Sequence, residues 1–165
     1  MCMHTSLSYT SLDTPIGRIY AVTEGVAVVE IAFERPLCPE ADQEHAALRQ
    51  LREYFNGERF SFDVEINPGR ISGFYAAVYR VLREIPYAAT CSYKELAQRA
   101  GSPSAARAVG QAMSKNPIPV ILPCHRVIAS DGTLGGYTGG IGVKEKLLAL
   151  EKRYESARHF PATGK

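Results

Sequence analysis

The chain has 165 residues, of which 45% are hydrophobic and 22% charged, so it has the balance of a globular protein and the length for one domain or two small ones. No window approaches the roughly 18 apolar residues of a membrane span, and the first six residues lack the basic flank and apolar run of an export signal. We therefore expect neither a membrane protein nor an exported one.

Charge is distributed unevenly along the chain. Residues 1–70 hold six Arg and Lys against eleven Asp and Glu, a net charge of −5, whereas residues 71–165 hold thirteen against six, a net charge of +7. A basic surface attracts polyanions, so the imbalance indicates that only the second half meets one. On charge alone, a chance imbalance between two solvated surfaces explains the numbers equally well.

The four cysteines lie far apart and form no CxxC pair: Cys2, Cys38, Cys91 and Cys124. This scatter does not fit the disulfide framework of a small secreted domain and favours reduced thiols in a cytoplasmic protein. Neither Cys2 with His4 nor Cys38 with His45 has the spacing of a known zinc site, so we expect no metal and no cofactor.

The first half is predicted to be a small α+β unit. Residues 7–33 have the pattern of short strands and turns, which predicts a hairpin or small sheet. Apolar residues then recur at helical spacing from Ala46 to Phe55, and Asn56-Gly57 ends the helix. Residues 63–70 are predicted to be a linker, with the domain boundary near Arg70.

The second half is predicted to be mainly helical. Ser72 caps a first helix that ends at Pro86, and Ser92 with Glu95 forms a capping box that opens a second helix. Ser102 caps a third helix that runs to about Met113. Two short helices joined by a tight turn are typical of a helix-turn-helix, although many helical domains that bind nothing share the pattern.

The third of these helices has few side chains of any size. Four alanines and Gly110 surround the single charged residue Arg107. Small residues let a helix approach another surface closely, and Arg107 is able to enter a groove or a gap in a base stack. The alternative, slightly favoured on this pattern alone, is a helix packed tightly in its own domain with Arg107 in solvent.

The segment Pro123-Cys124-His125-Arg126-Val127 is the strongest chemical signal. Residues 118–122 are predicted to lead into it in extended form, with Pro119 and Pro123 fixing the backbone. A thiol attacks mainly as thiolate, and the adjacent His125 and Arg126 predict a lowered pKa for Cys124. Residues 131–142 form a glycine-rich loop without the Gly-Lys-Ser/Thr ending of a phosphate-binding loop, so a pocket wall is expected. A final helix is predicted to end at residues 151–153.

Six motifs in order identify a resemblance to the methylated-DNA–protein-cysteine methyltransferase (O6-alkylguanine-DNA alkyltransferase) family. They are Ser92-Tyr93-Lys94-Glu95-Leu96-Ala97, Ala105-Ala106-Arg107-Ala108-Val109-Gly110, Asn116-Pro117, Pro123-Cys124-His125-Arg126-Val127, Gly135-Gly136-Tyr137-Thr138-Gly139-Gly140 and Lys144-Glu145-Lys146-Leu147-Leu148-Ala149-Leu150-Glu151. The resemblance implies an α+β protein: a small, ribonuclease H-like N-terminal domain over residues 1–70 and a mainly helical, alkyl-accepting helix-turn-helix domain over residues 71–165.

The resemblance also implies direct DNA repair. The helix-turn-helix would bind the minor groove of double-stranded DNA, an O6-alkylguanine (or O4-alkylthymine) would be flipped out, and its alkyl group would move irreversibly to Cys124. His125 would deprotonate Cys124 through a water, Glu151 would orient His125, Tyr93 would donate to the departing guanine, and Asn116 would order the turn. A monomer in the cytoplasm, or in the nucleus of a eukaryotic host, is expected, and cooperative binding to DNA stays open.

The family pattern assigns two further groups of residues. Those expected at the DNA are Arg107, which fills the space of the flipped base, and Ser92, Tyr93, Ala106, Gly110 and Arg126. Those expected to shape the substrate pocket are Met113, Val127, Tyr137 and Thr138. Two positions depart from the pattern: Tyr75 stands where glutamine is usual, and Ala88 where glycine is usual.

Two other classes of protein use some of these features. A cysteine hydrolase would use Cys124 and His125 for acyl transfer, but it needs an oxyanion hole and leaves the helix of Arg107 without a purpose. A DNA-binding module without chemistry would have no need of the acceptor Cys124.

Overall fold

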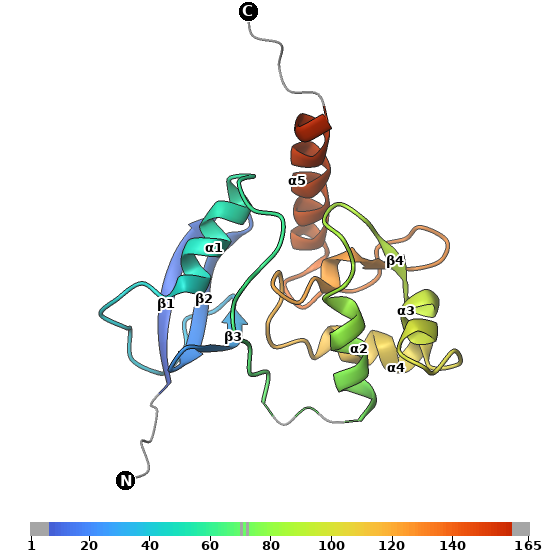
Figure 1. Cartoon of the computed structure of the whole chain (residues 1–165), viewed down its shortest axis with the longest axis horizontal. Helices are drawn as coiled ribbons and strands as arrows, with labels where there is room; N and C mark the ends of the chain where they lie inside the picture. The colour runs from blue at the N-terminus through green and yellow to red at the C-terminus, as the bar shows by residue number, and fades with distance from the viewer. Residues whose placement is uncertain (1–6, 70, 72, 160–165) are drawn as a thin grey trace, which may run out of the picture. The chain divides into compact units, whose positions relative to one another are not determined.

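The computed structural model describes residues 7–69, 71 and 73–159 (Figure 1). The chain divides into two compact units, one spanning Met1–Ile71 together with Pro117–Ile121 and the other spanning Ser72–Asn116 together with Leu122–Lys165. A single cut in the sequence does not describe this division, because a short segment from the second half belongs to the first unit. None of the described helices is long and apolar enough to cross a membrane.

The first unit is built on a three-stranded antiparallel sheet in the order β1-β2-β3. Its strands are β1 (Leu7–Thr14), β2 (Gly17–Glu24) and β3 (Ala27–Ala32). Two-residue connections join them, and Thr14 pairs with Gly17 while Glu24 pairs with Ala27. The predicted small sheet is therefore confirmed.

Helix α1 (Ala46–Phe55) packs on this sheet (Figure 1). Its buried face includes Leu48, Leu51 and Tyr54. The helix ends as predicted: Gly57, at a φ of +77°, donates to the carbonyl of Tyr54, and Glu58 donates to that of Glu53. These two bonds are the Schellman motif, which satisfies the last carbonyls of a helix and requires a residue that tolerates positive φ.

The second unit contains the predicted helix-turn-helix. Its helices are α2 (Phe74–Leu82), α3 (Tyr93–Arg99) and α4 (Ala106–Ser114). The capping box that opens α3 is confirmed, because Glu95 donates its backbone N–H to Ser92 Oγ at 3.1 Å while Ser92 donates its own to Glu95 Oε2 at 2.7 Å.

The remainder of the second unit brings the chemical motifs together. It comprises β4 (Cys91–Ser92), a 3₁₀ turn at Cys124–Arg126, β5 (Val127–Ile128) and α5 (Ile141–His159). β4 and β5 pair in parallel, with Cys91 opposite Val127. This pairing ties the start of α3 directly to the segment that follows Cys124, so the helix-turn-helix and the cysteine share one scaffold.

Four details differ from the sequence predictions. α4 begins at Ala106, because the residues after Ser102 form a separate turn in which Ala105 donates to the carbonyl of Ser102. Residues 118–122 are not extended: Val120 has a φ of +73° and lies in a turn. α5 continues past residue 153 to His159. The predicted cap Ser72 lies outside the described residues, and Gly73 occupies the N-cap position of α2.

Candidate active site

Cys124 begins the 3₁₀ turn and is buried, with 3% of its surface exposed. Its Sγ accepts a hydrogen bond of 3.0 Å from Asn116 Nδ2, and the same amide also donates to the carbonyl of Leu122 at 2.9 Å. Asn116 thus joins the end of α4 to the turn that carries the sulfur. The role suggested for Asn116, ordering the turn, requires such contacts.

The thiol of Cys124 has a raised pKa of about 11, which contradicts the lowered value expected from its neighbours. Burial is the dominant cause, and the hydrogen bond from Asn116 and the charge of Lys144 offset it only in part. His125 and Arg126 do not lower the pKa because the 3₁₀ turn directs both side chains toward Glu151. The positions of His125 and Arg126 next to Cys124 in the sequence did not reveal that their side chains point toward Glu151. At neutral pH the resting thiol is therefore protonated, and a base has to remove its proton.

His125 is fully buried, and its Nε2 lies 2.7 Å from Glu151 Oε1. Burial lowers the pKa of His125 despite the opposing effect of Glu151, so the ring is neutral at pH 7. Because the carboxylate only accepts, the single ring proton lies on Nε2. Nδ1 is then the basic nitrogen, and it is buried without a hydrogen-bond partner among the described residues. A neutral imidazole held in this tautomer has the properties of a general base.

Glu151 is completely buried on α5 and receives several donors. Arg126 donates to it from Nη2 at 2.8 Å and from Nε at 3.0 Å, and the backbone N–H of Ala88 donates at 3.0 Å. Burial alone would raise the pKa of this carboxyl, but the bonds from His125 and Arg126 outweigh it and bring the pKa to about 2. Glu151 is therefore ionised at neutral pH.

Arg126 was expected to contact DNA, and the structure gives it another place. Only 6% of the residue is exposed, and besides its bonds to Glu151 its Nη1 donates to the carbonyl of Ile85 at 2.7 Å. A guanidinium committed to a buried carboxylate is not available to a phosphate, so the assignment of Arg126 to the DNA surface is wrong.

Tyr93 is half-buried at the start of α3, immediately after β4. Burial and the proximity of Cys124 raise the pKa of its phenol, so it remains a proton donor. The glycine-rich loop touches it closely: a Cβ on Gly135 would lie 2.7 Å from the Tyr93 hydroxyl. Gly135 also has a φ of +67°, which favours glycine. The loop is thus placed against Tyr93, as expected for a wall of the site.

Replacing Gly135 by alanine is expected to lower the rate of the chemistry at this site by several-fold. The new methyl would push the Tyr93 hydroxyl aside and would add backbone strain of about 1–3 kcal/mol at a positive φ. The rate at Cys124 and the thermal midpoint measure the two effects. Gly136→Ala is the matched control, because nothing lies within 4 Å of its added Cβ; an equal loss in both variants would contradict the specific contact with Tyr93.

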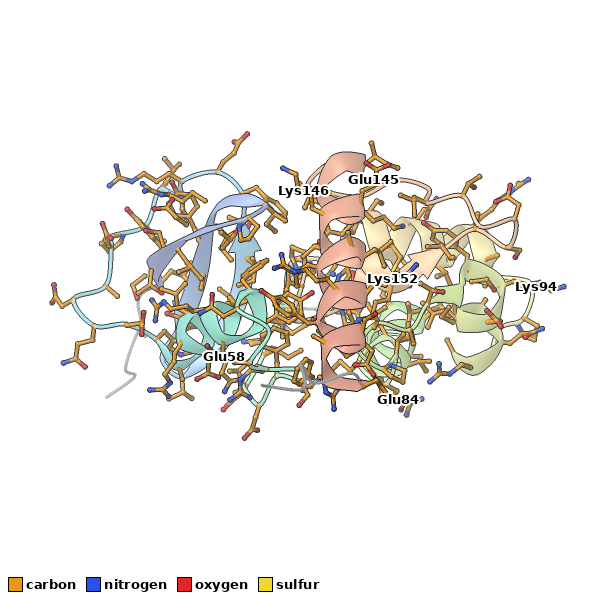
Figure 2. All side chains as sticks on the ribbon, turned by 90° about the horizontal axis from the view of Figure 1, so that it is seen from above. Glu58, Glu84, Lys94, Glu145, Lys146 and Lys152 are labelled. Carbon is orange, nitrogen blue, oxygen red and sulfur yellow. The ribbon has the colours of Figure 1, made fainter. Side chains whose placement is uncertain are left out.

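Sequence reasoning missed Lys144, which is fully buried on α5. Its ammonium donates to the carbonyl of Val127 at 2.5 Å and to that of Leu134, and it lies 6.0 Å from the centre of the Tyr93 ring. Burial lowers the pKa of Lys144, and its charge in turn lowers that of Cys124. The signal was the spacing of Lys144, Leu147 and Glu151, one buried stripe on α5, whereas Glu145, Lys146 and Lys152 project from the helix (Figure 2).

The four residues expected in the pocket have different environments. Met113 and Val127 are buried, Thr138 is exposed and donates to the carbonyl of Ser114 at 3.4 Å, and Tyr137 is half-buried. Burial, reinforced by Cys124, raises the pKa of Tyr137 well above its usual range, and Tyr137 in turn lowers that of Cys124. Tyr137 and Cys124 are therefore neighbours.

The remaining residues expected at the DNA lie on α3 and α4. Arg107 is exposed, Ala106 and Gly110 are half-buried, and the hydroxyl of Ser92 is occupied by the capping box. A Cβ built on Gly110 would meet nothing within 4 Å. The described residues contain no group of three or more metal-ligating side chains, and the pair Cys2 and His4 lies outside them.

The second unit is therefore a helix-turn-helix domain that holds a buried thiol next to a neutral histidine and its ionised carboxylate. Comparison with known proteins gives the family. The model of the 6-O-methylguanine DNA methyltransferase DNA-binding domain matches residues 73–153, and that of the ribonuclease-like domain of the same protein matches residues 7–68. The chain belongs to the 6-O-methylguanine DNA methyltransferase family.

Individual relatives agree over nearly the whole chain. The methylated-DNA–protein-cysteine methyltransferase of Mycolicibacterium paratuberculosis is 41% identical over 159 residues, which is 92% of this chain and 96% of the relative. The crystal structure of Mycobacterium tuberculosis O6-methylguanine methyltransferase superposes with a TM-score of 0.82 at 40% identity, covering 90% of this chain and 94% of that one. The crystal structure of the Mycobacterium tuberculosis protein OGT in complex with DNA gives a TM-score of 0.83 at 41% identity, covering 89% and 94%.

Proposed function

We propose that this protein repairs O6-alkylguanine in double-stranded DNA by transferring the alkyl group to Cys124 in a single, irreversible reaction. The observation that carries the proposal is the arrangement of Cys124, His125 and Glu151. The thiol of Cys124 is protonated and is bound by Asn116 near the end of α4, and the ionised carboxylate of Glu151 holds the neighbouring His125 ring as a neutral base. The relatives named as methylated-DNA–protein-cysteine methyltransferases support the choice of substrate.

The chemistry proceeds as one displacement. His125 Nδ1 takes the proton of Cys124 through a water, and the thiolate attacks the alkyl carbon, forming the C–S bond as the bond from carbon to guanine O6 breaks. Tyr93 donates a proton to the departing guanine, and the resulting phenolate regains a proton from the His125 imidazolium through solvent. The proton lost by the thiol thus balances the proton gained at the guanine, and the products are a thioether and unmodified guanine. Because a thioether is not hydrolysed at this site, each molecule acts once.

The surface of α4 supports DNA as the partner. A glycine in mid-helix costs about 0.5–1 kcal/mol relative to alanine, yet nothing in the described part of the second unit occupies the space beside Gly110. Packing within the unit therefore does not explain the glycine at this position. This weakens the alternative that the residues of α4 are small only because the helix packs tightly in its own domain. The small residues Ala106 and Gly110 beside the exposed Arg107 would allow the helix to approach a DNA groove closely. The crystal structure of a relative with DNA agrees with this partner.

The remaining expectations are part of the same proposal. Residues 71–165 would carry both DNA binding and the acceptor, and residues 1–70 would be structural. The protein would act as a monomer in the cytoplasm, or in the nucleus of a eukaryotic host. The three cysteines within the described residues are free thiols, which suits a reducing compartment.

The decisive experiment is intact-protein mass spectrometry after mixing with a duplex that contains one O6-methylguanine, followed by peptide mapping. We expect a gain of one methyl group on the Cys124 peptide that saturates at one per protein. Binding without a mass change would overturn the proposal and point to a recognition module. Catalytic turnover of an ester or peptide would indicate a cysteine hydrolase.

Arg107→Ala is expected to reduce repair of duplex DNA by about 10- to 100-fold, while reaction with free O6-alkylguanine base changes less than twofold. Unstacking a base costs a few kcal/mol, and Arg107 would repay part of it by filling the vacated space. Rates of methyl transfer from both substrates provide the measurement. Lys152→Ala, which removes an exposed charge from α5, is the control. Equal losses on duplex and free base would contradict a role in flipping.

A further inference from the structure

The turn that connects α2 to β4 contacts the Arg126–Glu151 ion pair at three points. The carbonyl of Ile85 accepts from Arg126 Nη1 at 2.7 Å, and the guanidinium carbon lies 5.6 Å from the centre of the Tyr87 ring. Beyond these, the backbone N–H of Ala88 donates to Glu151 Oε2 at 3.0 Å. Three neighbouring residues therefore contact the pair that holds His125, although they lie about 40 to 60 residues away along the chain.

Ala88 adopts a backbone conformation that a residue with a side chain normally avoids. Its φ is +59°, in the left-handed region, and the N–H of Ala89 closes the turn onto the carbonyl of Pro86. Such strain persists only where the surrounding structure holds it, and it concentrates at functional sites. Here the conformation accompanies the hydrogen bond to the buried carboxylate.

The donors divide between the two oxygens of Glu151. Oε1 accepts from His125 and from Arg126, and Oε2 accepts from Arg126 and from Ala88. Removing the Ala88 donor would leave the bond from Arg126 Nε to Oε2 in place, but the carboxylate would be less firmly fixed about its last bond. Because Oε1 holds the Nε2–H of His125, rotation of the carboxylate would also move the imidazole and its basic nitrogen, Nδ1.

We propose that Tyr87 and Ala88 are positioning residues for alkyl transfer: their turn fixes the Arg126–Glu151 pair, and the pair fixes His125. The inference rests on the proposed function. Both residues would act through the ion pair, since Tyr87 contacts Arg126 and Ala88 donates to Glu151. The turn also continues directly into β4 and Tyr93, so one segment would place the proton donor and support the base. Movement of this segment would therefore misplace the proton donor Tyr93 and the base His125 at the same time.

The test separates chemistry from DNA binding. Tyr87→Leu removes the ring face from Arg126, and Tyr87→Phe keeps the ring. The maximal single-turnover rate on O6-methylguanine duplex and the dissociation constant for the same duplex are measured for both. We expect Tyr87→Leu to lower the maximal rate about tenfold with a dissociation constant within twofold of the wild type, and Tyr87→Phe to retain the rate.

A backbone substitution tests Ala88 without changing its side chain. Replacing Ala88 by its α-hydroxy acid, lactic acid, through nonsense suppression exchanges the N–H for an ester oxygen. This variant is expected to lose rate by about tenfold with unchanged DNA affinity, whereas Ala88→Gly, which keeps the N–H, retains it. The ester variant decides the question if Tyr87→Leu does not fold.

Unchanged maximal rates in folded Tyr87→Leu and in the ester variant would overturn the positioning role. A parallel loss of rate and of DNA affinity would also overturn it, because general loosening of the unit would then explain the data. If the wild-type protein itself transfers no methyl group, the proposed function fails instead, so the two failures are distinguishable.

Discussion

Replacing Cys124 by serine is expected to reduce methyl transfer from O6-methylguanine DNA by about 10⁴-fold or more while leaving DNA affinity within twofold. A serine hydroxyl is a weaker acid and a harder nucleophile than a thiol, so His125 would not ionise it for attack on an alkyl carbon. The substitution changes one buried atom and no charge. Single-turnover transfer of a radiolabelled methyl group and an electrophoretic binding assay provide the two measurements.

Cys91→Ser is the matched control for this prediction. Cys91 is also buried, lies on β4 opposite Val127, and has a pKa raised by burial, so it is a second buried thiol on the same unit. It should retain full transfer. Methyl transfer that survives in Cys124→Ser and disappears in Cys91→Ser would identify Cys91 as the acceptor and refute the assignment made here.

Glu151→Gln should both unfold the protein more easily and slow the chemistry. The variant leaves the guanidinium of Arg126 buried without its counter-charge, and breaking a buried ion pair in this way costs about 3–5 kcal/mol. Loss of the orienting carboxylate should also slow transfer by roughly 10²-fold or more, the usual contribution of a general base. Urea denaturation and single-turnover kinetics at a temperature well below the midpoint of unfolding separate the two effects.

The same ion pair predicts a dependence of stability on pH. The folded pKa of Glu151 is about 2 and lies below its unfolded value near 4.5, so its contribution is present above pH 4.5 and is lost as pH falls toward 2. The pKa of His125 is also lowered, so the unfolded chain begins to take up a proton below about pH 6.5 while the folded chain does not. Stability therefore declines from pH 6.5 downward, and Glu151→Gln should make the decline below pH 4.5 smaller.

Glu155→Gln is the control on the same helix. Glu155 pairs with Arg158 at the surface, where such a pair contributes about 0–1 kcal/mol because solvent screens it. Its substitution should leave the urea midpoint and the acid profile nearly unchanged. If Glu155→Gln and Glu151→Gln lose equal stability, the cost would arise from α5 as a whole, and the specific account of the buried pair would be wrong.

Features encoded by neighbouring residues were predictable from the sequence. The capping box of Ser92 and Glu95 and the helix end at Gly57 depend on residues three or four positions apart, and both were confirmed. The motif around Cys124 likewise predicted which residues lie next to one another, because their order along the chain is itself the signal; the role of Cys124 as nucleophile stays a prediction.

What the sequence did not reveal depends on the direction of side chains and on burial. An arginine binds either a phosphate or a carboxylate, so its identity in the sequence does not reveal its partner. The 3₁₀ turn directs Arg126 to the buried carboxylate of Glu151. The pKa of Cys124 was misjudged for the same reason, since burial outweighs its neighbours. Lys144 was overlooked because a lysine at a core position contradicts the usual pattern of helix faces.

The burial of Cys124 also determines how long an unused molecule keeps its capacity to react. If the protein acts once, as proposed, a peroxide or a stray electrophile that reaches its sulfur first would inactivate it, and such attack follows thiolate character and exposure. With 3% of its surface exposed and a pKa near 11, Cys124 resists both routes until a base removes its proton. Cys38, which is half-exposed, is available to the same reagents and would be consumed first. Burial would thus protect the proposed acceptor thiol until the substrate is bound.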